Sequence, residues 1–227
     1  MGVLRLSSNI IGSEIILRPY QFCNLTEVVI RSTDTEQDLE RKIAVATILG
    51  TLQATYTKFP YLRQVWQDNT DEERLLGVSL TGIMDNPLTT TANPELPALL
   101  ERLRAVSVEV NKEWAGKLGI AVSTAITAVK PSGTVSQLVN SASGIHARHS
   151  EYYIRTVRGA FNDPLTQFMK DQGIPWEPCA HQPDTTVVFS FPQKSPDQAV
   201  LTENTTAIQQ LDTWLAYQRH YCEHKPS

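Results

Sequence analysis

Apolar residues recur along the chain at helical spacing, and this periodicity predicts several amphipathic helices. The clearest helix covers residues 96–118 and ends before Gly119, with an apolar stripe formed by Leu99, Leu103, Val106, Val110 and Trp114. A polar segment at 32–37 offers several N-cap residues, and the helix after it should run to about Lys58. Its expected stripe is Leu39, Ile43, Ala46, Leu49, Leu52 and Tyr56. Shorter helices are expected within 59–74, at 164–172 and at 206–221.

Short runs rich in β-branched and aromatic residues predict strands between these helices. The expected strands cover residues 14–19, 24–31, 75–83, 121–129, 152–158 and 185–192. Gly77 and Gly82 indicate a bend or a close backbone approach in the third of them. Strands alternating with helices favour a mostly parallel α/β sheet or barrel. Within it, we expect residues 15–17 to pair with residues 26–30, and Cys23 to lie near the mouth of that pair.

Composition narrows the class of protein. The chain has 227 residues, enough for one large domain or two small ones, and 41% of them are apolar. A net charge of -4 argues against a nonspecific nucleic-acid binder, because phosphates attract basic surfaces. The sequence contains no apolar run of membrane-spanning length and no convincing signal peptide, so we expect a cytoplasmic protein without a membrane partner. Its three cysteines fit a reducing compartment, and no metal site is expected.

The stretch KPSGTVSQLVNSASGIHARHS, residues 130–150, is the most unusual part of the sequence. Pro131-Ser132-Gly133-Thr134 follows an expected strand and precedes a short helical segment. Free backbone N–H groups at such a position favour phosphate or carboxylate, and Ser132, Thr134 and Ser136 add hydroxyl donors. An ordinary capped helix start has the same composition, so the motif alone leaves both interpretations open. It is not a P-loop, because the GK[ST] ending is absent.

Other candidates for chemistry are single residues. His146, Arg148 and His149 follow the same stretch, and they either are solvated or line a cleft. Cys23 lies between two expected strands, with Glu14 and Glu27 on either side of it. It could be a redox or nucleophilic thiol, although free cysteines commonly serve as small buried apolar residues.

Four segments together give these residues a context: SEIILRPYQFCNLTEVVIR, LGVSLTGIMD, KPSGTVSQLVNSASGIHARHSEYYIRTVR and TAIQQLDTWLAYQRHYCEHKPS. They resemble adenosylcobalamin-dependent ribonucleotide reductase of the monomeric class II kind, in the family's order and over nearly all of the chain after about Gly12. The resemblance implies that residues 14–227 are a C-terminal part of a ten-stranded α/β barrel, truncated at both ends. Residues 1–13 would be a degenerate or non-family segment.

The resemblance also implies roles for particular residues. Glu14 matches the finger-loop glutamate, a general base toward the ribose 3′-hydroxyl, and Cys23 matches one cysteine of the redox pair that reduces the ribose. The phosphate-binding loop of the family matches Pro131, Ser132, Gly133, Thr134, Val135 and Ser136. The implied substrate is a ribonucleoside triphosphate, and the implied cofactor is adenosylcobalamin, bound by the complete enzyme. The implied partners are a thioredoxin-like reductant and the missing N-terminal half.

One departure keeps other interpretations open. The position of the radical cysteine holds Gly12, and residues 1–22 contain no cysteine. A catalytically inactive nucleotide-binding fragment, from a decayed or intein-split gene, is therefore an alternative to a working part of the enzyme. An unrelated α/β phosphate-binding domain is a third, which would have to match all four segments by chance.

Overall fold

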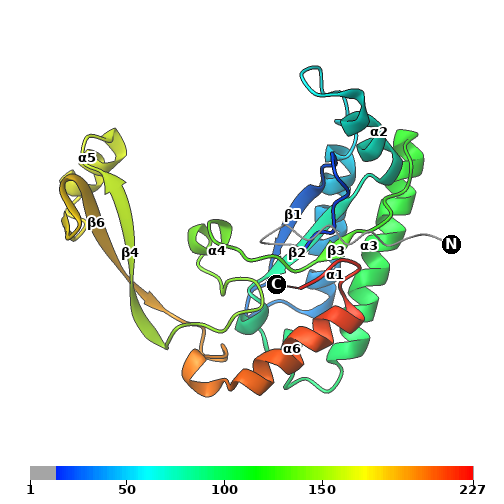
Figure 1. Ribbon diagram of the computed structural model, residues 1–227. Coiled ribbons are helices and arrows are strands. Elements are labelled where there is room, and N and C mark those ends of the chain that lie inside the picture. Colours follow the sequence, from blue (N-terminus) through cyan, green and yellow to red (C-terminus); the bar gives the residue numbers. More distant parts are fainter. Residues whose placement is uncertain (1–13, 227) are drawn as a thin grey trace. The chain divides into compact units, whose positions relative to one another are not determined.

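The computed structural model describes residues 14–226, and within them the chain divides into two compact units (Figure 1). Unit 1 contains residues up to Arg148 together with those from Gln198 onward, and unit 2 contains His149–Asp197.

Unit 1 is built on a three-stranded parallel sheet in the order β1-β2-β3. Its strands are β1 (Asn24–Val29), β2 (Leu76–Thr81) and β3 (Thr127–Ala128). β2 is central and every one of its residues is buried, as is usual for a parallel sheet covered on both faces. Asn24 pairs with Leu76, and Val78 pairs with Thr127.

The helices of unit 1 supply most of its core. α1 packs on β1 and β2 and against α3, and α3 packs against α6. The helices are α1 (Glu36–Gln53), α2 (Gln64–Glu73), α3 (Leu96–Leu118), α4 (Val135–Leu138) and α6 (Ala207–His220), with short 3-10 turns η1 (Ile83–Asp85), η2 (Pro87–Thr89) and η3 (Thr202–Asn204). Both α1 and α6 begin with a capping box, at Thr35 and Thr206.

The buried faces of the two long helices differ from the apolar stripes. In α1, Leu49 and Leu52 are exposed, and Tyr56 lies beyond the end of the helix. The buried face of α1 continues instead through Thr47 and Thr51, whose hydroxyls each donate to the carbonyl four residues earlier at 2.8 Å. In α3 it continues through Ser107, Asn111 and Ala115. Hydrogen-bonded polar side chains can be buried at little cost, and an apolar pattern cannot detect them.

Alternation along the strands separates two faces of the sheet. Gly50 of α1 approaches Leu76 and Thr26, so these positions face the helices. Gly77 points the other way, where a β-carbon would come within 2.5 Å of Leu25 and 3.0 Å of Ile15. We call this second side the inner face, and it also carries Ser79 and Ala128. The neighbours of Gly77 are side chains, so the close backbone approach is confirmed only at Gly82, which has φ +79° and adjoins the Ile30 carbonyl.

The predicted strand at 14–19 is wrong, and so is its pairing with residues 26–30. Residues 14–18 make no ladder, and β1 pairs with β2 instead. Pro19 and Tyr20 form a turn, with φ 63° at Tyr20, that ends the segment before it can pair. The packing of the buried Ile15 side chain holds the segment in place, whereas the next side chain, Ile16, is 59% exposed. The strand expected at 121–129 is reduced to two residues of ladder.

Unit 2 is a small antiparallel sheet in the order β4-β6-β5 with one helix, so the expectation of a mostly parallel sheet fails there. Its elements are β4 (Tyr152–Ala160), α5 (Pro164–Asp171), β5 (Trp176–Cys179) and β6 (Gln182–Lys194). The expected strands and helix are present, but β5 was not predicted, and the direction of pairing differs. Within residues 14–226, the two sheets do not close into a barrel.

Candidate functional site

Glu14 and Lys130 meet on the inner face of unit 1, although they are far apart in the sequence. Glu14 is buried, and its Oε2 lies 3.5 Å from Nζ of the partly exposed Lys130. Lys130 stands two residues after Ala128, so strand alternation puts both on the inner face. Its backbone N–H donates to Oγ of Ser79 at 2.9 Å, which continues the alignment past the end of β3.

Glu14 is positioned from both sides. Its neighbour Ile15 belongs to a small apolar cluster with Leu75 and Ala128. Its carbonyl accepts a hydrogen bond of 3.0 Å from the N–H of Lys225. Residues 225–226 in turn bridge to Val129. The last described residues of the chain therefore hold the carboxylate against the sheet.

Cys23 completes this group. It directly precedes β1 and packs against the cluster of Ile15, Leu75 and Ala128. Burial raises the pKa of the Cys23 thiol, and the Lys130 ammonium lowers it in part. The net direction is upward, so the sulfur carries its hydrogen at neutral pH. We name Glu14, Cys23 and Lys130 the inner-face triad.

The sequence did not single out Lys130. The only signal was its position, two residues after a buried strand residue and directly before the Pro-Ser-Gly-Thr run. An isolated lysine at a strand end is common on protein surfaces, so the role of this one became visible only through its contacts.

The run from Pro131 to Ser136 leaves the sheet next to Lys130 and leads into α4. Gly133, Thr134 and Val135 are exposed, and their backbone N–H groups make no hydrogen bond within the described part of the chain. These groups are free to receive an anion.

The two buried serines of this run have a different role from the one expected. Ser132 Oγ accepts from the N–H of Ser136 at 3.0 Å, and the Ser136 hydroxyl donates to the Ser132 carbonyl. Both side chains are buried. Their hydroxyls thus stabilise the turn, and of the three hydroxyls expected to donate, only that of Thr134 is exposed.

The two histidines and the arginine that follow the run differ in their exposure to solvent. His146 and His149 are exposed. Arg148 is neither solvated nor in a cleft, because its guanidinium is buried and lies on both carboxylate oxygens of Asp85, at 2.7 and 2.8 Å. Nothing in the sequence indicated that Asp85 is the partner of Arg148.

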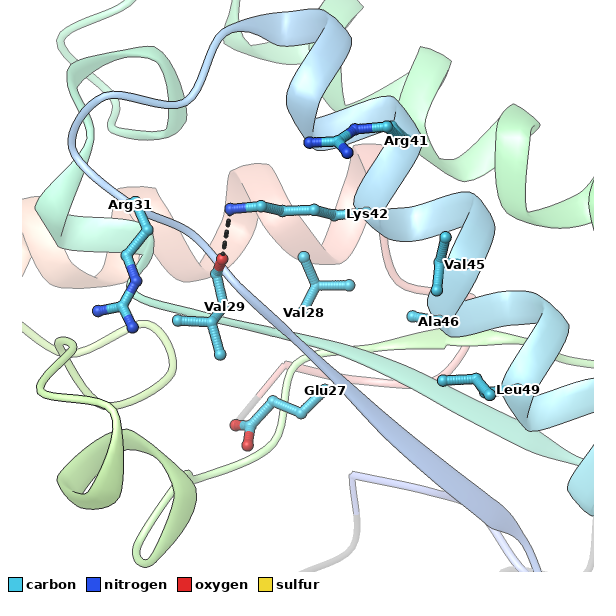
Figure 2. A pocket seen from close by; sticks show the side chains of 9 residues that line it. All are labelled: Glu27, Val28, Val29, Arg31, Arg41, Lys42, Val45, Ala46 and Leu49. Carbon is cyan, nitrogen blue, oxygen red and sulfur yellow. Dashed lines mark hydrogen bonds between the residues drawn. The ribbon is translucent and has the colours of Figure 1, made fainter.

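A separate pocket of about 390 Å³ lies between β1 and the flank of α1 (Figure 2). Its floor is apolar and cations line part of its wall. Lys42 Nζ donates hydrogen bonds to the Val29 carbonyl at 3.0 Å and to Oδ2 of Asp34 at 2.5 Å. The Arg31 guanidinium donates to the Val139 carbonyl at 2.6 Å. Among the described residues β1 is an edge strand, so the pocket adjoins unpaired backbone, and its lining reaches Glu27, which pairs with Ser79.

Within the described residues, none of the helices combines the length and apolar character needed to span a bilayer. Gly12, which occupies the expected position of a radical cysteine, and the rest of residues 1–13 lie outside the described residues.

Comparison with known proteins gives a consistent set of relatives, although no protein-family model matches the chain. The chain is 28% identical over 214 residues to the adenosylcobalamin-dependent ribonucleoside-triphosphate reductase of Euglena gracilis, covering 93% of this chain and 28% of that protein. It is 31% identical over 172 residues to the protein of the same name from Lactobacillus gasseri, covering 63% of this chain and 23% of that protein.

A solved structure supports the same relationship at the level of fold. A B12-dependent class II ribonucleotide reductase superposes with a TM-score of 0.78 at 23% identity, over 93% of this chain and 33% of that protein. The chain spans about a third or less of the length of the relatives that it matches. In sequence and in fold, the chain is thus related to one section of the adenosylcobalamin-dependent ribonucleoside-triphosphate reductases.

Proposed function

We propose that residues 14–227 form part of the catalytic barrel of a reductase that converts ribonucleoside triphosphates to 2′-deoxyribonucleoside triphosphates. The observation that carries the proposal is the inner-face triad, because the fold brings Glu14 and Cys23 together beside Lys130, directly before an exposed run of free N–H groups. The names of the relatives support it.

In this proposal each residue has a stated task. The Glu14 carboxylate accepts the proton of the ribose 3′-hydroxyl as general base. The Cys23 thiol supplies a hydrogen to the ribose, the 2′-hydroxyl leaves as water, and the two electrons come from a cysteine pair of which Cys23 is one member. A thioredoxin-like dithiol reduces the resulting disulfide. The N–H groups of residues 133–135 bind the triphosphate, with Lys130 at the base of the run.

The relatives are named for adenosylcobalamin, which supplies radical initiation when bound. The pocket beside α1 does not fit this cofactor. The pocket beside α1 has the size of a site for a drug-like molecule, and a corrinoid with its nucleotide tail is much larger. We therefore place cofactor binding in the complete enzyme and assign no step of it to these residues.

The test combines the chain with a polypeptide that supplies the remaining length of a relative, and measures deoxyribonucleotide formed from ribonucleoside triphosphate with adenosylcobalamin and a dithiol. Because Gly12 has no thiol, we expect activity in the Gly12→Cys variant. In that background, Glu14→Gln or Cys23→Ser should lower the rate by about 100-fold or more. Cys179→Ser, a thiol change in unit 2, is the control and should leave it unchanged.

Gly12 also favours a second candidate, a nucleotide-binding fragment without catalysis. This candidate predicts that the chain binds ribonucleoside triphosphate but that neither the parent nor Gly12→Cys forms product in the combined system. Activity of the parent with a cysteine supplied in trans would exclude it.

A further inference from the structure

The pair Asp85–Arg148 is the most deeply buried ion pair among the described residues. The side chains of both residues are 3% exposed. The guanidinium meets the carboxylate with two hydrogen bonds, Nε to Oδ1 at 2.7 Å and Nη2 to Oδ2 at 2.8 Å. Buried ion pairs often add little stability compared with apolar residues, so overall stability does not account for this one.

The pair holds one short segment. Asp85 Oδ2 accepts from the N–H of Ala142 at 2.8 Å, while Arg148 donates to the side-chain and main-chain oxygens of Asn140, at 2.9 and 3.0 Å. Asn140 has φ 49°, in the left-handed region. The pair thus fixes residues 140–142, through which the chain returns from α4 to the sheet.

The next residue, Ser143, links this segment to the proposed phosphate-binding run, residues 131–136. The Ser143 hydroxyl donates to the Ser132 carbonyl at 2.9 Å. Gly144 lies so close to the Lys130 carbonyl that a β-carbon would come within 2.8 Å of it, and its N–H donates to Oγ1 of Thr81 at 2.8 Å. Contacts therefore run without interruption from Asp85, through residues 140–144, to Ser132 and Lys130.

We propose that Asp85 and Arg148 are positioning residues for the nucleotide site, and that they set the backbone of residues 131–136 and the place of Lys130. The inference rests on the proposed function. Neither residue is assigned a contact with substrate. They act through Ala142, Ser143 and Ser132, and their removal should affect triphosphate binding more than the stability of unit 1.

The informative variant is the double change Asp85→Leu with Arg148→Met in the full 227-residue chain. It removes both charges together, so no buried charge is left unpaired, and the melting temperature should fall only by the cost of the Ala142 N–H that loses its acceptor. The hydrogen bonds to Ala142 and Asn140 are lost. Asp85→Asn serves as a second variant, which keeps the shape and leaves Arg148 without its counter-ion.

Two measurements are made on each protein. Amide hydrogen exchange reports the order of residues 132–144, and titration with each ribonucleoside triphosphate, followed by NMR, reports binding. We expect exchange about tenfold faster at Ser136, Ala142 and Gly144, with β2 and α3 still protected, and about tenfold weaker triphosphate binding. The control is Asn111→Ala, which removes a buried hydrogen-bonding side chain of α3 that bonds Thr51 and Ser123. It should leave both readouts near those of the parent.

The outcomes separate the two proposals. If the parent binds triphosphate and the double variant binds it equally well, the positioning role is wrong while the nucleotide site stands. If residues 132–144 stay protected in the double variant, the positioning role is also wrong. If the parent binds no ribonucleoside triphosphate, the proposed function fails at this site and the positioning role falls with it.

Discussion

Lys130 determines the electrostatics of the inner-face triad. Its ammonium lies 3.5 Å from the Glu14 carboxylate and acts on the Cys23 thiol as well. Charges interact more strongly where the sheet and the segment at 14–18 exclude part of the water. One cation thus connects the two residues that the proposed reaction uses, and it leads directly into the run proposed to bind phosphate, residues 131–136.

Alkylation of Cys23 tests this arrangement. Burial raises its pKa above the usual 9.0, so labelling by iodoacetamide should be slow at pH 7 and rise with an apparent pKa above 9.0. Lys130→Met removes the charge that lowers this pKa, and labelling at pH 9 should then slow severalfold. Peptide mass spectrometry separates Cys23 from Cys179 and Cys222. Lys117→Met, an exposed lysine of α3 paired with Glu113, is the control. An apparent pKa below 9.0 for Cys23 would contradict the buried position.

His224 gives a second prediction at this scale. It is buried, and its Nε2 bonds the Leu76 carbonyl at 2.8 Å. Burial lowers its pKa below the usual 6.5. The unfolded chain therefore takes up a proton before the folded one does, and His224 makes stability fall as the pH drops from 6.5 through the folded pKa. Above 6.5 this contribution is complete.

Urea unfolding between pH 5 and 8 measures the effect. His224→Gln should show a flatter loss of stability below pH 6.5 than the parent, because the titrating group is gone. His146→Gln changes an exposed histidine and should keep the slope of the parent. Equal slopes in all three proteins would show that His224 does not contribute.

At the scale of elements, the proposed phosphate binding by residues 131–136 depends on backbone N–H groups more than on hydroxyls. Ser132 and Ser136 use their hydroxyls on each other's main chain, and this leaves the N–H groups between them exposed. The serines thus shape the run, and the residues between them are available to a ligand.

Substitutions in the run should therefore separate stability from binding. Ser132→Ala leaves the Ser136 N–H buried without its acceptor, which should cost about 1–3 kcal/mol in the free energy of unfolding. Gly133→Val has open space around its β-carbon, so stability should change little. A branched side chain beside the free N–H groups should nevertheless weaken triphosphate binding. Chemical denaturation and nucleotide titration check the two effects. The interpretation fails if Gly133→Val binds ribonucleoside triphosphate as tightly as the parent.

At the scale of the whole molecule, the edge of the parallel sheet is the notable feature. Within residues 14–226, β1 has a partner on one side only, and Lys42 caps one of its carbonyls. The adjoining flank of α1 exposes Val45 and Leu49, at 51% and 56%. Unpaired strand edges next to apolar surface favour association between chains.

We expect the isolated chain to self-associate through this edge. The double change Val45→Lys with Leu49→Glu should shift it toward monomer in sedimentation velocity, with little change in the melting temperature, because both side chains are exposed. The matched control is Ile208→Lys with Leu211→Glu, which changes exposed apolar residues of α6 and should leave association as in the parent. A monomeric parent at micromolar concentration would contradict the expectation.

The sequence by itself predicted those helices and strands whose pattern lies within their own residues. The periodicity and Gly119 defined the long helix at 96–118, and the β-branched runs marked β1, β2, β4 and β6. The motifs around Glu14, Cys23 and 131–136 also indicated the family, because residue identity and order suffice for that. Burial of Thr47 or Asn111 could not be predicted in this way, since it depends on hydrogen-bond partners elsewhere.

Tertiary structure decided which distant residues meet. Glu14 pairs with Lys130, Asp85 with Arg148, and β1 with β2 rather than with the segment before it. Each of these contacts closes a long loop of chain, and a local pattern carries no information on which loop closes. The same reason explains the direction of pairing in unit 2, where β4 and β6 were predicted from their composition but their antiparallel order arises only when the chain folds back on itself.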